Sequence, residues 1–317
     1  MSHAILVAAV CFVAGVLLYP ALVTVLARAG AGQMVQEYNP SSTHRAKAGT
    51  PTMGGILFCL VAVAVWLATD RTHAGFVIAY ALVGGAAVGF LDDLANVRGL
   101  GSLGLDVRQK LLLQAVVGVA VGFGLHAAGA TTQDLPGAGM LDLGWGIVPI
   151  AAIAVVATTN AVNLTDGVDG LAASCVGIAL VGAITSSIWL GASSAAALAA
   201  ALLGTLAAFL VFNWHPARIF MGDTGALGLG AALTAICVEA HLLWLLPLLG
   251  IVFAVETASV IVNVTAITRF RKRLFRASPL HHHFERLGVS EQRLALLFAA
   301  AGAVALALTL LMVHAVV

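Results

Sequence analysis

Long apolar runs alternate with short polar segments along the whole chain. The runs predict ten helices, most of them close to the roughly 20 residues that cross the hydrocarbon core of a bilayer. The stretch 225–268 is too long for one span, and His241 and Pro247 bracket the expected break, because proline interrupts a helix. The predicted helices are 4–26, 55–69, 75–91, 109–128, 145–160, 171–190, 194–212, 225–242, 248–268 and 292–316.

The composition agrees with this pattern. Of the 317 residues, 61% are hydrophobic and only 9% are charged, whereas a soluble domain averages about 25% charged residues. We therefore expect an all-α polytopic membrane protein that forms one domain over residues 1–317. The segment 129–144 is expected to form a small hairpin. Four cysteines lie in apolar runs, and we interpret them as small buried residues rather than disulfide partners: Cys11, Cys59, Cys175 and Cys237.

The basic residues are distributed unevenly between the two sides of the predicted membrane domain. Ten spans would place the segments 27–54, 92–108, 161–170, 213–224 and 269–291 on one side. Of the 15 Lys and Arg residues, only Arg71 falls clearly on the other side. Because cytoplasmic loops carry an excess of Lys and Arg, we assign the basic side to the cytoplasm and both termini to the outside.

Acidic residues stand at the cytoplasmic ends of several predicted helices. Near a membrane an acid is costly unless it has a partner or a function. Helix capping is one explanation, and Asp223 is well placed to cap the helix that follows it. Because five acids come from three loops on one face, we favour a ligand site, in which nearby bases such as Lys47 and Lys110 would accompany magnesium and phosphate. The five acids are Asp92, Asp93, Asp166, Asp169 and Asp223.

Five motifs on the cytoplasmic side occur in a characteristic order: "GTPTMGG", "FLDD", "NAVNLTDGVDGLA", "FMGDTG" and "PLHHHFE". Together they resemble the polyprenyl-phosphate N-acetylhexosamine-1-phosphate transferases. The first and last motifs are similar, within that superfamily, to the phospho-N-acetylmuramoyl-pentapeptide transferases. The resemblance implies transfer of phospho-MurNAc-pentapeptide from its UDP carrier to undecaprenyl phosphate, with lipid I and UMP as products. It also implies Mg²⁺, a homodimer, contact with membrane lipids and a place in the bacterial cytoplasmic membrane; we expect no nucleic-acid partner.

The same resemblance implies roles for three of the acids. Asp223 corresponds to the magnesium ligand, and Asp92 to the residue that orients or deprotonates the lipid phosphate. Asp93 corresponds to a residue that assists Asp92. A phosphate monoester has its second pKa at about 6, so much of it is already dianionic at neutral pH. We therefore expect positioning and electrostatic stabilisation to matter more than proton abstraction.

Further positions match substrate-binding residues of the family. Asp169 and the backbone of Gly167 and Val168 are expected to hold uracil, and Phe220 is expected to stack on it. Simpler roles remain open, since Phe220 could pack on neighbouring helices and Lys47 could be a charge at the lipid surface. The matched set is Lys47, Lys110, Asn163, Asp166, Gly167, Val168, Asp169, Asn213 and Phe220.

Two other groups of polar residues are expected to have structural or topological roles rather than catalytic ones. Arg269, Arg271, Lys272 and Arg273 are expected to determine topology and to contact anionic lipid. Glu256, which lies within a predicted helix, is expected to make structural hydrogen bonds.

The triple histidine His281–His282–His283 follows Pro279 and Leu280. Zinc is not favoured, because no cysteine or second histidine cluster accompanies it. Successive residues of a helix point about 100° apart, so the three rings could not face one ligand. We expect a loop beside the active site, in which His281 and His282 contact phosphate or sugar and His283 supports the fold.

Two alternative functions remain open on the sequence. Buried acids and interrupted helices also mark ion-coupled transporters, but transporter acids cluster near the membrane midplane, whereas these acids lie at predicted helix ends. A related transferase that uses UDP-GlcNAc is the second alternative, and the triple histidine argues against it.

Overall fold

The computed structural model describes residues 1–32, 49–69, 71–98, 104–135 and 137–315. Lys47, one of the predicted substrate-binding residues, lies outside this part of the chain. Ten helices of 14 residues or more occur among the described residues, and each corresponds to one predicted helix. They are α1 (Ser2–Arg28), α3 (Ile56–Thr69), α4 (His73–Val97), α5 (Val107–Ala127), α6 (Ile147–Thr165), α7 (Leu171–Trp189), α8 (Ser193–Asn213), α9 (Gly222–Glu239), α11 (Ile251–Phe270) and α13 (Glu291–His314).

The bundle has the apolar exterior of a membrane protein. Eight of the described helices are long and apolar enough to cross a bilayer, while α3 has 14 residues and α9 has an acid near each end. Leu17, Leu112 and Leu311 are among the large apolar side chains exposed on outer helices, where a soluble surface would carry charge. The predicted class, an all-α polytopic membrane protein, is confirmed.

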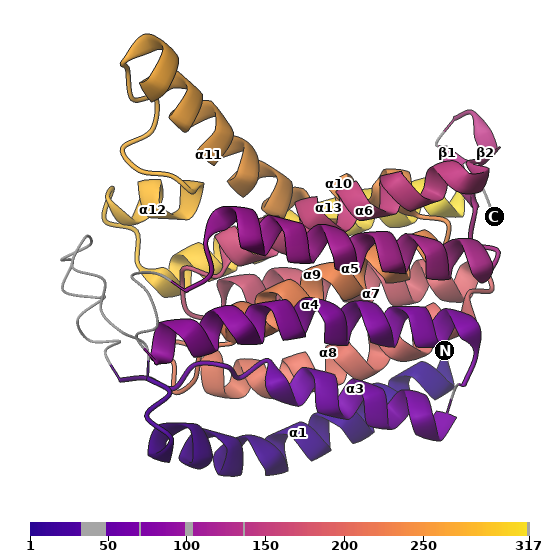
Figure 1. Ribbon diagram of the computed structural model, residues 1–317, viewed down its shortest axis with the longest axis horizontal. Helices are drawn as coiled ribbons and strands as arrows, with labels where there is room; N and C mark the ends of the chain where they lie inside the picture. Colours follow the sequence, from indigo (N-terminus) through magenta and orange to yellow (C-terminus); the bar gives the residue numbers. More distant parts are fainter. Residues whose placement is uncertain (33–48, 70, 99–103, 136, 316–317) are drawn as a thin grey trace.

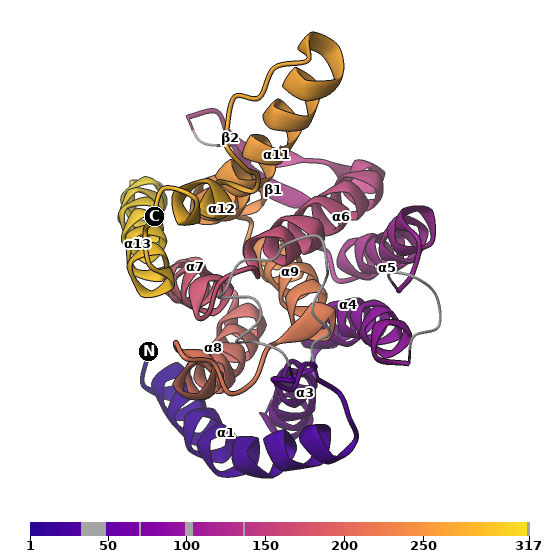
Figure 2. The same cartoon turned by 90° about the vertical axis from the view of Figure 1, so that its left-hand side faces the viewer.

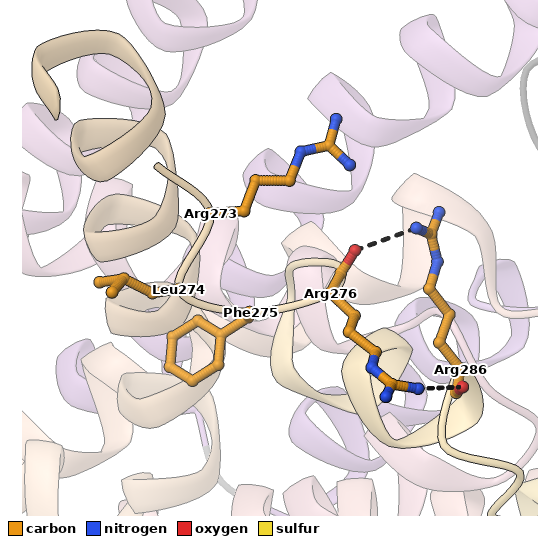
Figure 3. A pocket seen from close by; sticks show the side chains of 5 residues that line it. All are labelled: Arg273, Leu274, Phe275, Arg276 and Arg286. Atoms are coloured by element: carbon orange, nitrogen blue, oxygen red, sulfur yellow. Dashed lines mark hydrogen bonds between the residues drawn. The ribbon is translucent and has the colours of Figure 1, made fainter. Parts of the chain in front are cut away.

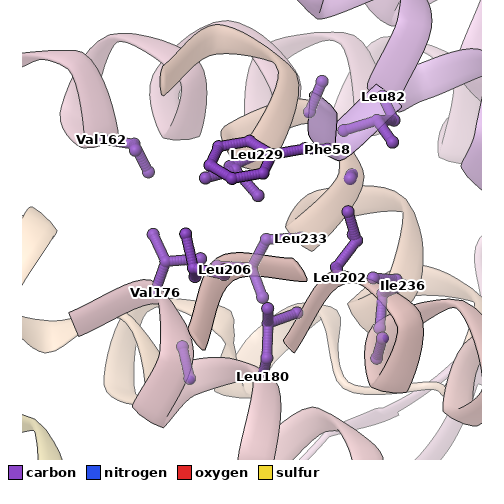
Figure 4. Packing of buried hydrophobic residues seen from close by; sticks show 14 of the residues in the cluster. Phe58, Leu82, Val162, Val176, Leu180, Leu202, Leu206, Leu229, Leu233 and Ile236 are labelled. Carbon is purple, nitrogen blue, oxygen red and sulfur yellow. The ribbon is translucent and has the colours of Figure 1, made fainter. Parts of the chain in front are cut away.

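Helix α9 is the centre of the bundle (Figure 2), and α4, α6, α7 and α8 lie around it. Every residue from Thr224 to Val238 is buried, as expected for a helix that packs on all sides. Leu229, Leu233 and Ile236 of α9 belong to the same buried core cluster as Phe58, Leu82 and Val162 (Figure 4). Asp223, the acid at the start of α9, is thereby held at one end of the most enclosed helix.

The two ends of the bundle differ in character (Figure 1). Both termini and the antiparallel hairpin β1 (Thr132–Leu135) and β2 (Gly139–Asp142) lie at one end, which confirms the predicted hairpin. The short helix α12 (Leu280–Glu285) lies at the other end. Between α9 and α11 the chain forms the short helices η2 (Leu243–Leu245) and α10 (Leu246–Leu249), so the break falls where the sequence predicts it. The remaining short element, η1 (Gly144–Gly146), leads into α6.

Two sequence predictions about local structure are wrong. Helix α4 continues to Val97 instead of ending at residue 91, so Asp92 and Asp93 lie inside it. The histidine segment is not a loop, because His281–His283 belong to α12. The Glu256 carboxylate of α11 accepts the backbone N–H groups of Leu280 and His281, and so satisfies donors that the first turn of a helix leaves without partners. This contact confirms the structural role expected for Glu256.

Glycines allow α4 and α9 to approach each other at backbone distance. A Cβ atom on Gly89 would lie 2.1 Å from the carbonyl oxygen of Asp223, and one on Gly85 would lie 2.6 Å from that of Leu227. A side chain at either position would force the helices apart. The close approach brings the acids of α4 to the first turn of α9.

Candidate active site

Asp93 of α4 caps the N-terminus of α9. Its carboxylate accepts hydrogen bonds from the backbone N–H groups of Asp223 (3.1 Å) and Thr224 (2.9 Å), and from the Thr224 hydroxyl (2.6 Å). These N–H groups are among the donors that a helix start leaves unsatisfied. Capping therefore does explain one acid, but the cap comes from another helix, and the Asp223 side chain is available for other partners.

Asp223 is the point where four helices meet. Lys110 of α5 donates to its Oδ2 atom, and the amide of Asn163 from α6 donates to its Oδ1 atom over 2.7 Å. Lys110 Nζ also lies 3.6 Å from Asp92 Oδ2 of α4. Asp92, Asp93, Lys110, Asn163 and Asp223, all singled out in the sequence, thus form one cluster.

Asp92 is fixed by neighbours that the sequence analysis missed. Its Oδ1 atom accepts the backbone N–H of Leu105 (2.9 Å), and its Oδ2 atom accepts the amide of Asn96 (3.2 Å). Asn96 lies four residues after Asp92 in α4, and this spacing places two side chains on one helix face. The i,i+4 spacing could have identified Asn96, but only if the helix had been predicted to extend that far.

The cluster suits a hard divalent cation. The carboxylates of Asp92 and Asp223 both approach the Lys110 ammonium, so the fold already directs two carboxylates at one positive centre. Magnesium commonly takes one or two protein carboxylates together with substrate phosphates. Asp223 is the more accessible of the two, with a side chain 23% exposed against 7% for Asp92. Its exposure leaves room for ligand oxygens.

A second polar network lies around Asp169. Its Oδ2 atom accepts from His215 Nδ1 (2.9 Å) and from the backbone N–H of Ala217 (3.1 Å). Its own backbone N–H donates to Glu291 Oε2 (3.2 Å). The network joins the α6–α7 loop, the α8–α9 loop and the start of α13. His215 and Glu291 were not predicted, since no motif pairs them with Asp169 in the sequence.

Asn213 and Phe220 are held by backbone contacts of the α8–α9 loop. The Asn213 side chain accepts from Gly170 N–H (3.0 Å) and donates to the Ile219 carbonyl (2.9 Å). The Phe220 backbone donates to the Pro51 carbonyl (2.8 Å) and accepts from Gly54 N–H (2.9 Å). The "GTPTMGG" segment is therefore bonded to the loop that leads into α9, and the ring of Phe220 is half-buried.

The remaining loop residues surround the end of α6. Asp166 is the C-terminal cap residue of α6, Gly167 follows it, and Val168 is buried. A Cβ atom on Gly167 would lie 2.4 Å from Nε2 of His281. Only glycine permits this ring to rest against the backbone, and α12 is thereby positioned against the candidate site.

The three histidines face different surroundings. His281 is fully buried, with Nδ1 3.2 Å from Glu256 Oε1. His282 Nδ1 lies 2.5 Å from Glu285 Oε2, and this ring is 26% exposed. His283 Nδ1 accepts the backbone N–H of Arg276 (3.1 Å). The rings of His281 and His282 lie beside each other, with centroids 4.2 Å apart, and His282 is the more accessible of the two predicted to contact substrate.

Comparison with known proteins agrees with the geometry. Residues 74–241 match the family described as glycosyl transferase family 4, and residues 47–59 match the phospho-N-acetylmuramoyl-pentapeptide-transferase signature 1. The membrane bundle and its cluster of acids and lysine therefore define a membrane-embedded glycosyl transferase.

Individual relatives narrow this class. The chain is 41% identical to phospho-N-acetylmuramoyl-pentapeptide-transferases of Geobacillus thermodenitrificans, over 93% of each chain, and Geobacillus kaustophilus, over 95% of each. It is 40% identical to that of Bacillus pumilus over 92% of each chain. The chain belongs to the phospho-N-acetylmuramoyl-pentapeptide-transferase family.

The cap contributed by Asp93 can be tested apart from chemistry. Asp93→Ala should lower stability by about 0.5–2 kcal/mol, the usual cost of losing an N-cap, and should slow turnover because the backbone of Asp223 loses an anchor. Asp93→Asn should retain part of the stability, since the single amide oxygen can still accept one of the two backbone N–H groups. Thermal unfolding and UMP release from the purified protein would measure both effects.

Asp106→Ala supplies the matched control for this experiment. Asp106 caps α5 through the backbone N–H groups of Arg108 and Gln109, so its loss should lower stability with little effect on turnover per folded molecule. The capping account is wrong if Asp93→Asn unfolds at the wild-type temperature and yet is as inactive as Asp93→Ala.

Proposed function

We propose that this chain transfers phospho-MurNAc-pentapeptide from UDP-MurNAc-pentapeptide to undecaprenyl phosphate, giving lipid I and UMP. One observation carries the proposal: Asp92, Asp223, Lys110 and Asn163 converge at helix ends in a membrane bundle of this family. Phosphoryl transfer needs mainly positioning and charge stabilisation, and a lysine with two carboxylates provides both. The lipid acceptor can reach such a site from within the membrane.

The residues present fit Mg²⁺, with Asp223 as its principal ligand and Asp92 as the second. When bound, the ion would neutralise charge on the diphosphate. Lys110 supplies further positive charge for phosphate oxygens, and Asn163 holds the Asp223 carboxylate in place. Asp92 orients the lipid phosphate, whose predominantly dianionic form needs little help from a base. Asp93 supports the reaction through the backbone of Asp223.

The nucleotide would bind beside this cluster. We assign uracil to Asp169 with the backbone of Gly167 and Val168, and stacking to Phe220. Asp166, Asn213 and Lys47 complete the group. Asp169 and Asn213 already hold neighbouring loops, so they also keep the nucleotide site in shape.

The triple histidine would act at the sugar phosphate. His282 is the best placed for direct contact, because its ring is partly exposed. His281 would reach substrate only if the short helix moved, since its ring is buried against Gly167. His283 supports the fold through Arg276.

The membrane arrangement follows from the same proposal. Ten crossings would place both termini outside the cytoplasm, consistent with their position at one end of the bundle (Figure 1), and the bacterial cytoplasmic membrane would contain the enzyme. The family resemblance further suggests a homodimer.

A transporter is disfavoured, because Asp223 lies in the first turn of α9 and Asp92 near the end of α4 rather than at helix centres. A UDP-GlcNAc-dependent transferase is disfavoured by the relatives' names.

Replacement of Asp223 tests the proposed chemistry. Asp223→Asn should abolish magnesium-dependent release of UMP from UDP-MurNAc-pentapeptide, because a neutral amide holds Mg²⁺ far more weakly than a carboxylate does. Asp92→Asn should reduce turnover at least about 100-fold, the lower range for a positioned catalytic group. Near-normal turnover of Asp223→Asn would refute the metal assignment, and a loss below tenfold for Asp92→Asn would limit Asp92 to a structural role.

The orientation can be tested with a reporter fused after Val317. An odd number of crossings would separate the termini, whereas ten crossings place both outside the cytoplasm. A periplasmic signal from reporters at both termini is expected. A cytoplasmic signal at either one would overturn the ten-crossing arrangement.

A further inference from the structure

Glu291, the first residue of α13, is a buried acid that the proposed chemistry does not use. Its side chain is only 5% exposed, and a carboxylate is costly to bury without partners. An acid in the first turn of a helix is favourable in itself, but this carboxylate also reaches beyond its own helix. Its Oε2 atom accepts the backbone N–H of Asp169 (3.2 Å) and lies 3.9 Å from Nδ1 of His215. A residue of α13 thus contacts the loop between α6 and α7.

The α6–α7 loop is held by side chains from other elements. The consecutive backbone N–H groups of Asp169 and Gly170 donate to Glu291 and Asn213. The carboxylate of Asp169 accepts in turn from Nδ1 of His215. Two of the five residues from 166 to 170 are glycine, which restricts the backbone little. The contacts from outside therefore determine the conformation of this loop.

The same network joins the two segments to which the proposed function assigns the base. The backbone N–H of Ala217 donates to the Asp169 carboxylate (3.1 Å), and three residues later this segment carries Phe220. Stacking on an aromatic ring accepts any base, whereas hydrogen bonds to the edge of the base distinguish one base from another. The edge contacts belong to the α6–α7 loop, so discrimination between bases depends on how that loop is held against the α8–α9 segment.

We propose that Glu291 and His215 are positioning residues that set the preference of the nucleotide site for uracil. They hold the 166–170 loop so that its hydrogen-bonding groups meet the edge of the base. The inference rests on the proposed function, which assigns uracil to this loop, and it deepens that function by naming the residues that determine its specificity. A role limited to stabilising the start of α13 would affect unfolding and leave the choice between bases unchanged.

Binding of UMP and CMP to the purified protein separates these roles. The two nucleotides share ribose and phosphate and differ only at the edge of the base, so the ratio of their dissociation constants reports the loop. Calorimetric titration with Mg²⁺ present should show that the wild type prefers UMP by at least about tenfold, the effect of one hydrogen bond. Glu291→Ala and His215→Ala should reduce this preference to less than about threefold. Glu291→Gln should retain at least about fivefold, because its amide oxygen still accepts the Asp169 N–H.

Two control variants separate this effect from loss of stability and from a change of charge. Val313 is buried near the C-terminal end of α13, so Val313→Ala should lower the unfolding temperature and leave the preference for UMP unchanged. Arg273 is exposed and lines a pocket with Arg276 and Arg286 (Figure 3), where the drawn hydrogen bonds join only the latter two. Arg273→Gln removes a charge outside the network, and it should leave both the preference and the unfolding temperature unchanged.

Three results would overturn the inference. The wild type could bind UMP and CMP equally, or Glu291→Ala and His215→Ala could keep the wild-type ratio while weakening both nucleotides, which would make the two residues structural. Glu291→Gln could also be as unselective as Glu291→Ala, which would exclude the hydrogen bond to Asp169 as the cause. If the wild type binds neither nucleotide, the proposed function itself fails, and that outcome is distinct from the other three.

Discussion

The hydrogen bonds from the start of α9 to Asp93 connect the fold of this protein to its chemistry. A helix that begins inside a membrane protein must satisfy its first N–H groups, because water is scarce there. Asp93 does so from α4, and Gly89 lets the two backbones approach closely enough for the contact. Since the cap comes from another helix, the Asp223 carboxylate is free to face Lys110 and Asn163.

The same packing of helices brings the carboxylates of Asp92 and Asp223 close to the ammonium group of Lys110. Two carboxylates from different helices would repel each other without a cation between them, and Lys110 from a third helix supplies it. Because the cluster holds both carboxylates and a lysine, it suits Mg²⁺, which would face the carboxylates, and substrate phosphates, which would face Lys110. The histidine helix α12 lies at the same end of the bundle, with the His281 ring against Gly167 of the α6–α7 loop.

Much of this organisation could be predicted from the sequence. The apolar runs and the polar segments between them located the ten long helices, the break near His241 and the hairpin, because the length of an apolar run is the dominant signal in the sequence of a membrane protein. The motifs also singled out Asp92, Asp93, Asn163 and Asp223, and the family resemblance added Lys110; the fold brings these five residues together. Contacts between segments distant in sequence were not predictable. Examples are the cap from Asp93 to α9, the His215–Asp169–Glu291 network and the helical form of His281–His283, which depends on Glu256 of α11.

The most direct test of the account is the substrate choice of the purified protein. UMP release would be measured with UDP-MurNAc-pentapeptide or UDP-GlcNAc, each with undecaprenyl phosphate and Mg²⁺. The proposed function predicts rapid release from UDP-MurNAc-pentapeptide that depends on the acceptor lipid, and little release from UDP-GlcNAc. Equal or faster release from UDP-GlcNAc, or release that does not depend on undecaprenyl phosphate, would contradict it.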